Sequence, residues 1–265
     1  MGRFDHVLRQ GIGKLAATLR LRRWVRRRDA QRRTENPAPL GRKKYLYAAP
    51  IGESGKAQLE KLLGRFDPAH FDFLIFVYDG YRFEGEIFER CTFIHEKGFV
   101  YHFFKKYLTP ELAARYDVIF IGVEDVEIDD FSWQRFLDVM SRNQLDMAAP
   151  ALSTKSITPH QIMIQRPTGV GRLVDVIEVF LTAFDARAWP RFWALIEADM
   201  NHWGWGYVQL AQAHCDFKMG LVDAETVSVL RAPTFRQEAQ DGMNALFAKH
   251  PNCRRAKFIS YGRLE

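Results

Sequence analysis

Cysteine is scarce in this sequence of 265 residues, which contains only Cys91, Cys215 and Cys253. An odd number of widely separated thiols fits neither a disulfide framework nor a zinc-ligand spacing. Long apolar runs are also missing, since none approaches the roughly 20 residues that a membrane-spanning helix needs. The sequence therefore favours a globular protein of a reducing compartment, and its 47% hydrophobic and 14% aromatic residues suffice for a large packed core.

The positive charge is concentrated at the N-terminus. Residues 1–35 contain ten arginines and one lysine against three acids, a net charge of +8, whereas the whole chain carries +6. The remaining residues therefore sum to −2, and the folded body offers no basic face for nucleic acid. We expect no nucleic-acid partner.

The same arm has an amphipathic pattern. One helical face would carry Phe4, Leu8, Ile12, Leu15 and Leu19, and an arginine-rich stretch around Trp24 follows. This combination suits an anionic membrane surface, so we predict a cytoplasmic protein that binds peripherally to the inner face of a membrane. A solvated basic tail and a mitochondrial-type presequence are the alternatives.

The rest of the chain predicts an α/β domain. Residues 36–43, with Pro37 and Pro39, form a linker to a domain at 44–235, and residues 236–265 are expected to pack on it as a tail. Strand and helix patterns then alternate, which predicts βαβ units and a mostly parallel sheet. The expected strands are 44–49, 71–78, 88–95, 117–123, 146–150, 160–165, 176–184, 217–222 and 226–230, and the expected helices are 54–63, 100–108, 132–142 and 186–200.

The sharpest feature is a run of acids after the most apolar strand. Residues 119–123 are followed by five carboxylates at positions 124–130. Ligands of open α/β sheets bind outside the carboxyl ends of the strands, and clustered carboxylates there attract a cation. Asp125 and Glu127, two residues apart, would project to one side of an extended segment and hold Mn²⁺ or Mg²⁺. The alternative is an acidic loop in which Asp129 or Asp130 caps the next helix.

Several stretches together resemble one family, the glycosyltransferase-like domain of unknown function 707. They occur in the family's order between residues 44 and 230: Ala49-Pro50-Ile51-Gly52, Val77-Tyr78-Asp79-Gly80, Tyr101 to Leu108, Tyr116 to Phe120, Glu124-Asp125, Phe131, Ala149 to Leu152, Phe184 to Trp189, Gly204-Trp205-Gly206 and Val222-Asp223-Ala224-Glu225. This family is similar to the GT-A nucleotide-sugar fold, a Rossmann-type sheet flanked by helices.

The resemblance implies a metal-assisted transfer of a sugar from a nucleotide-sugar donor to a glycan or lipid-linked acceptor. Asp125 and Glu127 would correspond to the DxD-type metal motif. Donor contacts would come from Pro50, Ile51, Gly52, Asp79, Lys105 and Glu124. A solvated helix face is the alternative for Lys105.

A further motif, Trp203-Gly204-Trp205-Gly206, suits the apolar face of an acceptor sugar, because flat indoles alternate with glycines. Burial of the indoles in the core is the alternative. The nearest candidates for a catalytic acid or base are Asp199 and His202, with Asp223 and Glu225 as further candidates.

The sequence departs from the family's pattern in three places. Glu127 stands where the family more often has Gly or Asn, Tyr207 and Val208 where it has an acid, and Val229 where it has a His. These departures leave a second function open, a nucleotide-sugar or glycan-binding protein that has lost turnover. A metal-dependent phosphoester hydrolase is a third, for which the expected additional His and Asp spacing is missing.

Overall fold

A computed structural model describes residues 45–158, 160–167, 169–197, 210, 214–229, 231 and 237–265. The basic arm, the linker, Asp199, His202 and the Trp203-Gly204-Trp205-Gly206 motif lie outside the described residues. None of the helices in the described ranges has the length and hydropathy to cross a membrane.

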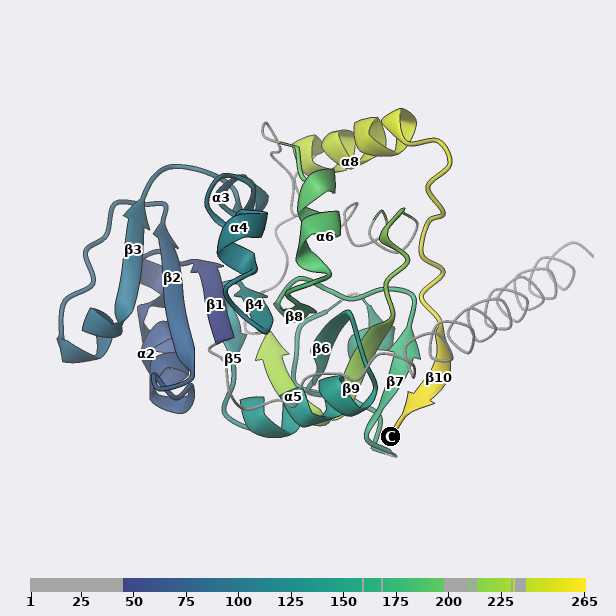
Figure 1. The fold of residues 1–265 in the computed structure, drawn as a ribbon, viewed down its shortest axis with the longest axis horizontal. Coiled ribbons are helices and arrows are strands. Elements are labelled where there is room, and N and C mark those ends of the chain that lie inside the picture. Colours follow the sequence, from purple (N-terminus) through teal and green to yellow (C-terminus); the bar gives the residue numbers. More distant parts are fainter. Residues whose placement is uncertain are drawn as a thin grey trace, which may run out of the picture.

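One mixed sheet forms the centre of the protein (Figure 1). Its strand order is β10-β7-β9-β6-β8-β4-β1-β2-β3. The short strand β5 is not part of this order and pairs with β9. The strands are β1 Tyr45–Pro50, β2 Phe71–Val77, β3 Cys91–His95, β4 Val118–Gly122, β5 Val126–Glu127, β6 Met147–Leu152, β7 Gly171–Val174, β8 Leu181–Asp185, β9 Met219–Val229 and β10 Ser260–Leu264.

Helices cover this sheet, with α3, α4, α6 and α8 above the strands and α5 below them in Figure 1. The α-helices are α2 Lys56–Arg65, α3 Val100–Tyr107, α4 Pro110–Ala113, α5 Trp133–Arg142, α6 Trp189–Leu195 and α8 Gln237–Lys249, and the short 3₁₀ helices are η1 Glu53–Gly55, η2 Glu86–Arg90 and η3 Gln161–Met163. This architecture confirms the predicted α/β class with a parallel and mixed sheet.

The sheet has two differently built halves. Strands β3, β2, β1 and β4 are parallel neighbours, as expected for buried apolar strands joined by helical connections. Beyond β4 the pairing alternates, because β8 runs antiparallel to both β4 and β6, whereas β9 is parallel to β6. The parallel half therefore brings the carboxyl ends of β4, β1 and β2 to one edge.

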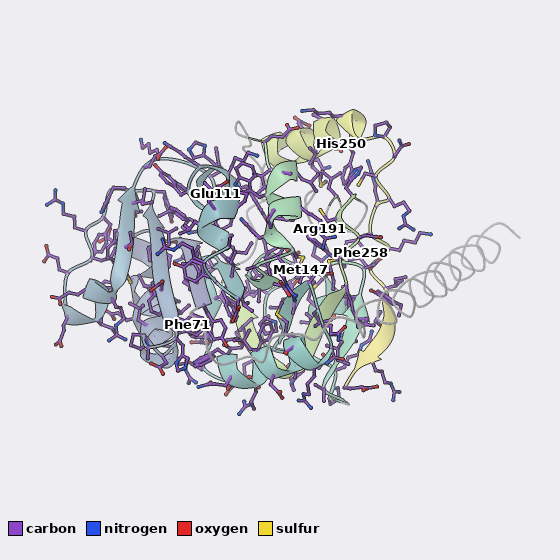
Figure 2. The ribbon with its side chains drawn as sticks, in the orientation of Figure 1. Phe71, Glu111, Met147, Arg191, His250 and Phe258 are labelled. Atoms are coloured by element: carbon purple, nitrogen blue, oxygen red, sulfur yellow. The ribbon has the colours of Figure 1, made fainter. Side chains whose placement is uncertain are left out.

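Aromatic side chains fill the core. Phe66 on the segment after α2 contacts Phe71, Phe120 and Phe131, with ring centroids 4.7 to 5.9 Å apart. Phe71 and Phe258, both labelled in Figure 2, lie towards opposite ends of the sheet. Burial of these rings stabilises the fold, since each one removes about 150–250 Å² from water.

Three predictions for the second half of the chain were wrong. The expected strand 176–184 begins only at Leu181, because a turn precedes it in which Thr182 Oγ1 donates to the Glu178 carbonyl at 3.0 Å. Residues 161–163 form η3 in place of a strand. The two strands expected at 217–222 and 226–230 are one strand, β9. Apart from these three, the segment expected as a C-terminal tail contributes β10 to the main sheet beside β7.

Candidate functional site

The candidate site lies where the loops after β1, β2 and β4 meet. Ile51 and Gly52 follow β1, Asp79 follows β2, and Glu124 and Asp125 follow β4. Because β4, β1 and β2 are parallel neighbours, these loops leave the sheet at the same edge. The family resemblance implied that these loops contact a common donor, and the fold brings them to one edge.

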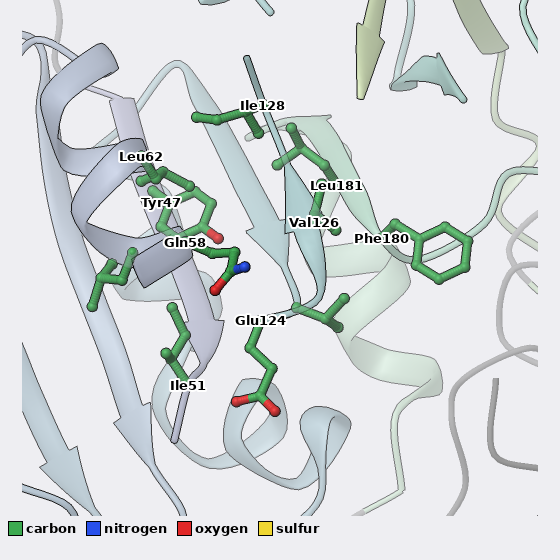
Figure 3. Close-up of a pocket in the computed structure, with 11 residues that line it drawn as sticks. Tyr47, Ile51, Gln58, Leu62, Glu124, Val126, Ile128, Phe180 and Leu181 are labelled. Carbon is green, nitrogen blue, oxygen red and sulfur yellow. The ribbon is translucent and has the colours of Figure 1, made fainter. Parts of the chain in front are cut away.

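Glu124 ties the β4 loop to the β1 loop. Its Oε2 accepts a hydrogen bond from the Gly52 amide at 2.9 Å, and its Oε1 accepts one from Ser54 Oγ at 2.9 Å. Figure 3 shows the carboxylate pointing away from the apolar side chains Leu62 and Ile128, towards the end of the β1 loop. Both oxygens are therefore engaged in fixing the loop that precedes α2.

Asp79 holds the same loop from the other side. Its Oδ2 accepts from the Glu53 amide at 2.8 Å and its Oδ1 from the Tyr81 amide at 3.1 Å. Gly52 allows this close approach, since a Cβ added there would lie 2.5 Å from Asp79 Oδ2 and 2.9 Å from the Tyr78 hydroxyl. The backbone of Gly52 thus sits between two carboxylates, while Pro50 and Ile51 are buried beneath it.

Arg231 places a positive charge beside the acidic turn. Its Nη1 lies 3.3 Å from Asp125 Oδ1 and 3.6 Å from Glu124 Oε1. The short antiparallel pair of β5 with β9, in which Val126 faces Val229, brings Arg231 there. Burial raises the pKa of Asp125, an effect that Arg231 opposes and Glu124 reinforces.

Glu127 has a different partner. Its Oε1 accepts from Lys61 Nζ on α2 at 2.9 Å, and the same ammonium reaches Asp129. Across the described ranges, no group of three or more His, Cys, Asp or Glu residues is arranged to hold a metal ion. The prediction that Asp125 and Glu127 together hold Mn²⁺ or Mg²⁺ thus gains no support, because each carboxylate contacts a cation of the chain itself.

Lys105 contacts α6. Its Nζ donates to the Trp193 carbonyl at 3.2 Å and lies 3.6 Å from the centre of the Trp193 ring. Burial lowers the pKa of this lysine. The described contacts thus use Lys105 to join α3 to α6 through a cation–π interaction, and they do not support the predicted phosphate contact.

Asp223 and Glu225 lie in a bulge of β9. Pro150 of β6 faces Val222, whereas the next residue, Ala151, faces Thr226, so residues 223–225 have no partner in this ladder. Asp223 is 3% exposed and lies 3.2 Å from Arg172. Glu225 is fully buried, accepts from the Ser132 amide at 2.6 Å and pairs with Arg135 at 2.5 Å.

These two acids stabilise the fold in the described structure. Burial raises the pKa of Asp223, but both carboxylates are enclosed by partners of the chain, and Glu225 satisfies an amide at the start of α5. A catalytic acid or base needs access to the reacting atom. The structure therefore gives the prediction of catalytic roles for Asp223 and Glu225 no support.

The sequence analysis assigned no role to three other polar groups, Tyr78, Glu178 and Arg231. Burial, reinforced by Glu124, raises the pKa of the Tyr78 hydroxyl. Glu178 precedes β8 and lies 3.2 Å from His160, and burial raises its pKa to about 7. The third group is Arg231, which meets Glu124 and Asp125 across more than 100 residues, so no local motif could have identified that contact.

A small pocket lies beside the acidic turn, between α2 and the β4–β5 segment (Figure 3). It is lined mainly by apolar side chains, among them Tyr47, Leu62 and Leu181, with Gln58 and Glu124 as polar members. Its volume of about 10 Å³ corresponds to no more than about one water molecule. A nucleotide would have to bind outside it, at the loop edge.

Solved structures share this fold. The structure is similar to that of residues 1–349 of the glycosyltransferase S. aureus TarS in complex with UDP-GlcNAc, with a TM-score of 0.56. The two sequences are 7% identical, and the similarity covers 81% of this chain and 68% of the TarS chain. The structure of TarS 1–349 in complex with UDP gives a TM-score of 0.53 at 9% identity and covers 81% of this chain and 67% of the TarS chain. The likeness shows a glycosyltransferase-like fold and confirms the predicted fold class.

No curated protein matches the chain. A family profile described as "Protein of unknown function (DUF707)" matches residues 4–172. The match includes most of the arm, which the predicted resemblance over 44–230 left out, and it ends at the start of β7. Since it covers more than half of the sequence, the chain belongs to the DUF707 family.

Proposed function

We propose that this protein binds a nucleotide-sugar at the carboxyl ends of β4, β1 and β2 and transfers the sugar to a glycan or lipid-linked acceptor. The observation that carries the proposal is that two carboxylates at this edge of the sheet fix the loop after β1: Glu124 accepts from the Gly52 amide and Asp79 from the Glu53 amide. Ligands of α/β sheets bind at such edges, and the similar TarS structures contain UDP and UDP-GlcNAc.

A binding screen tests the donor. UDP, GDP, CMP and their sugars are added to the full chain, and thermal stability is measured with Mn²⁺ and with EDTA. A ligand at a hundred times its dissociation constant adds about 2.7 kcal/mol to the free energy of unfolding. We expect one nucleotide class to raise the melting temperature, and no response to any nucleotide would contradict the proposal.

Two glycine variants provide a matched control. A Cβ at Gly52 would meet the Asp79 carboxylate and the Tyr78 hydroxyl, whereas one at Gly64 of α2 meets nothing within 4 Å. We expect Gly52→Ala to lose at least tenfold in nucleotide affinity and Gly64→Ala to bind like wild type. Equal affinities would place the nucleotide away from the β1 loop.

The alternative function is nucleotide-sugar or glycan binding without turnover. It is favoured by the burial of Asp223 and Glu225, two of the four predicted catalytic residues. Hydrolysis of the bound nucleotide-sugar, or transfer to an added acceptor, separates the two functions. Binding without either reaction supports the non-catalytic one.

We also propose that residues 1–35 hold the protein on an anionic membrane surface, because ten arginines accompany an amphipathic pattern there. Replacing the six arginines between positions 20 and 28 by glutamine in the full chain should abolish salt-sensitive binding to vesicles containing phosphatidylserine. Unchanged binding would dismiss this role.

A further inference from the structure

The acidic turn after β4 already contacts a cation, the guanidinium of Arg231. In glycosyltransferases with a DxD-type motif, a divalent metal ion would be expected at this turn. Here Arg231 Nη1 lies beside this turn, 3.6 Å from Glu124 Oε1 and 3.3 Å from Asp125 Oδ1. The second predicted ligand, Glu127, is paired with Lys61.

We infer that Arg231 is the resident counter-cation of the acidic turn, and that it takes the place of a divalent metal ion there, including towards the diphosphate of a bound donor. The diphosphate part of this inference rests on the proposed function. The part that concerns the metal ion depends only on the chain itself.

Charge balance supports the inference. Glu124 and Asp125 carry two negative charges and Arg231 one positive charge, which leaves a net charge of −1 for the three side chains. A metal ion entering this group would have to displace the guanidinium or share the carboxylates with it, at the cost of like-charge repulsion. The guanidinium therefore competes with a metal ion for these two carboxylates.

Geometry supports a role towards phosphate. Arg231 contacts Glu124 and Asp125 through Nη1, and its side chain is 53% exposed. A guanidinium has five donors in a planar fork, so Nη2 and Nε can donate to phosphate oxygens while Nη1 stays on the carboxylates. A metal ion bridging a carboxylate and a diphosphate fulfils the same electrostatic role.

Strand pairing brings the end of β9 close to the acidic turn. The pairing of Val126 with Val229 and of Glu127 with Ser228 sets the register of β5 against β9. Arg231 comes two residues after Val229 in the sequence, and its guanidinium contacts Glu124 and Asp125, which directly precede β5.

Mn²⁺ alone tests the first part. The full chain is titrated with Mn²⁺ in the absence of nucleotide, and binding is followed by electron paramagnetic resonance. We expect Arg231→Gln to bind Mn²⁺ at least tenfold more tightly than wild type, and Arg231→Lys, which keeps the charge, to resemble wild type. Equal Mn²⁺ affinity of wild type and Arg231→Gln would overturn the inference.

Lys61→Gln is the matched control, because it removes one positive charge from the same acidic stretch but frees Glu127 and Asp129. We expect less than a twofold change in its Mn²⁺ affinity. If Lys61→Gln bound Mn²⁺ more tightly than wild type and Arg231→Gln did not, the metal site would lie at Glu127 and the inference would be overturned.

UDP tests the second part. Wild type should bind UDP with the same affinity in EDTA and in Mn²⁺, whereas Arg231→Gln should lose at least tenfold in EDTA. UDP binding by wild type in Mn²⁺ only would overturn the inference and leave the proposed function standing. The absence of UDP binding in both conditions would overturn the diphosphate part together with a uridine donor, whatever the result with Mn²⁺ alone.

Discussion

Both halves of the sheet carry a pair of acidic residues, the parallel half just after β4 and the mixed half inside β9, but their surroundings differ. At the end of β4, Asp125 and Glu127 remain about one third exposed. In the bulge of β9, Asp223 and Glu225 are buried and paired within the chain. The comparison shows that acidic residues of the same sheet are left accessible after β4 and are enclosed inside β9, so only the first pair can be reached by a ligand.

The largest expected effect comes from the mixed half. Asp223→Asn removes the anion beside Arg172, which is itself 4% exposed and has Nε and Nη1 without a hydrogen-bond partner in the described part of the chain. Removing one partner of a buried ion pair costs about 3–5 kcal/mol. Urea denaturation should show a loss of this size. Unchanged stability together with lost sugar transfer would return Asp223 to the list of catalytic candidates.

A smaller loss is expected for Glu225→Gln. Its partner Arg135 is 70% exposed and becomes hydrated when the carboxylate is removed, so the cost should be about 2 kcal/mol, that of a charge-assisted hydrogen bond. Arg135→Gln should cost more, because it leaves the fully buried Glu225 without its cation. The reverse order in urea denaturation would contradict a role for Glu225 in holding α5.

In the parallel half the expected effect is local. Glu124→Ala leaves the Gly52 amide and Ser54 Oγ without their acceptor, at a cost of about 1–3 kcal/mol. Hydrogen exchange should speed up at the Gly52 amide, whereas the Tyr81 amide, held by Asp79, serves as the internal control. Equal protection at Gly52 in both proteins would mean that Glu124 does not fix the β1 loop.

The last prediction concerns pH. Burial raises the pKa of Glu178 to about 7, so the folded state binds a proton that the unfolded state has lost, and stability falls as pH rises from the ordinary carboxyl range to about 7. Glu178→Gln removes this slope. The free energy of unfolding of the variant minus that of wild type should therefore be larger at pH 8 than at pH 5.

Urea midpoints at the two pH values measure this difference. The exposed Glu86→Gln provides the correction for a general loss of negative charge. His160, whose pKa burial lowers, adds a slope of the opposite sign at the acidic end of the range in wild type. A pH-independent difference between Glu178→Gln and wild type would argue against a protonated Glu178 in the folded state.

The sequence determined the α/β class, the parallel strands and the loops of the candidate site. Buried parallel strands appear as short apolar runs such as 118–122, and their order with helices between them predicts which ends share an edge. Local signals also account for the start of α4, where Thr109 caps the helix and Pro110 begins it. Each of these features depends on residues close together in the sequence.

Tertiary structure decided the partners of the acidic residues. Asp125 meets Arg231 and Glu127 meets Lys61 across more than 60 residues, and the acids of the β9 bulge meet Arg172 and Arg135. A carboxylate has the same local sequence whether a metal ion, an arginine or a helix terminus neutralises it. The choice depends on which distant side chain strand pairing brings within about 4 Å, because the electrostatic interaction of a partly buried charge is dominated by its nearest partner.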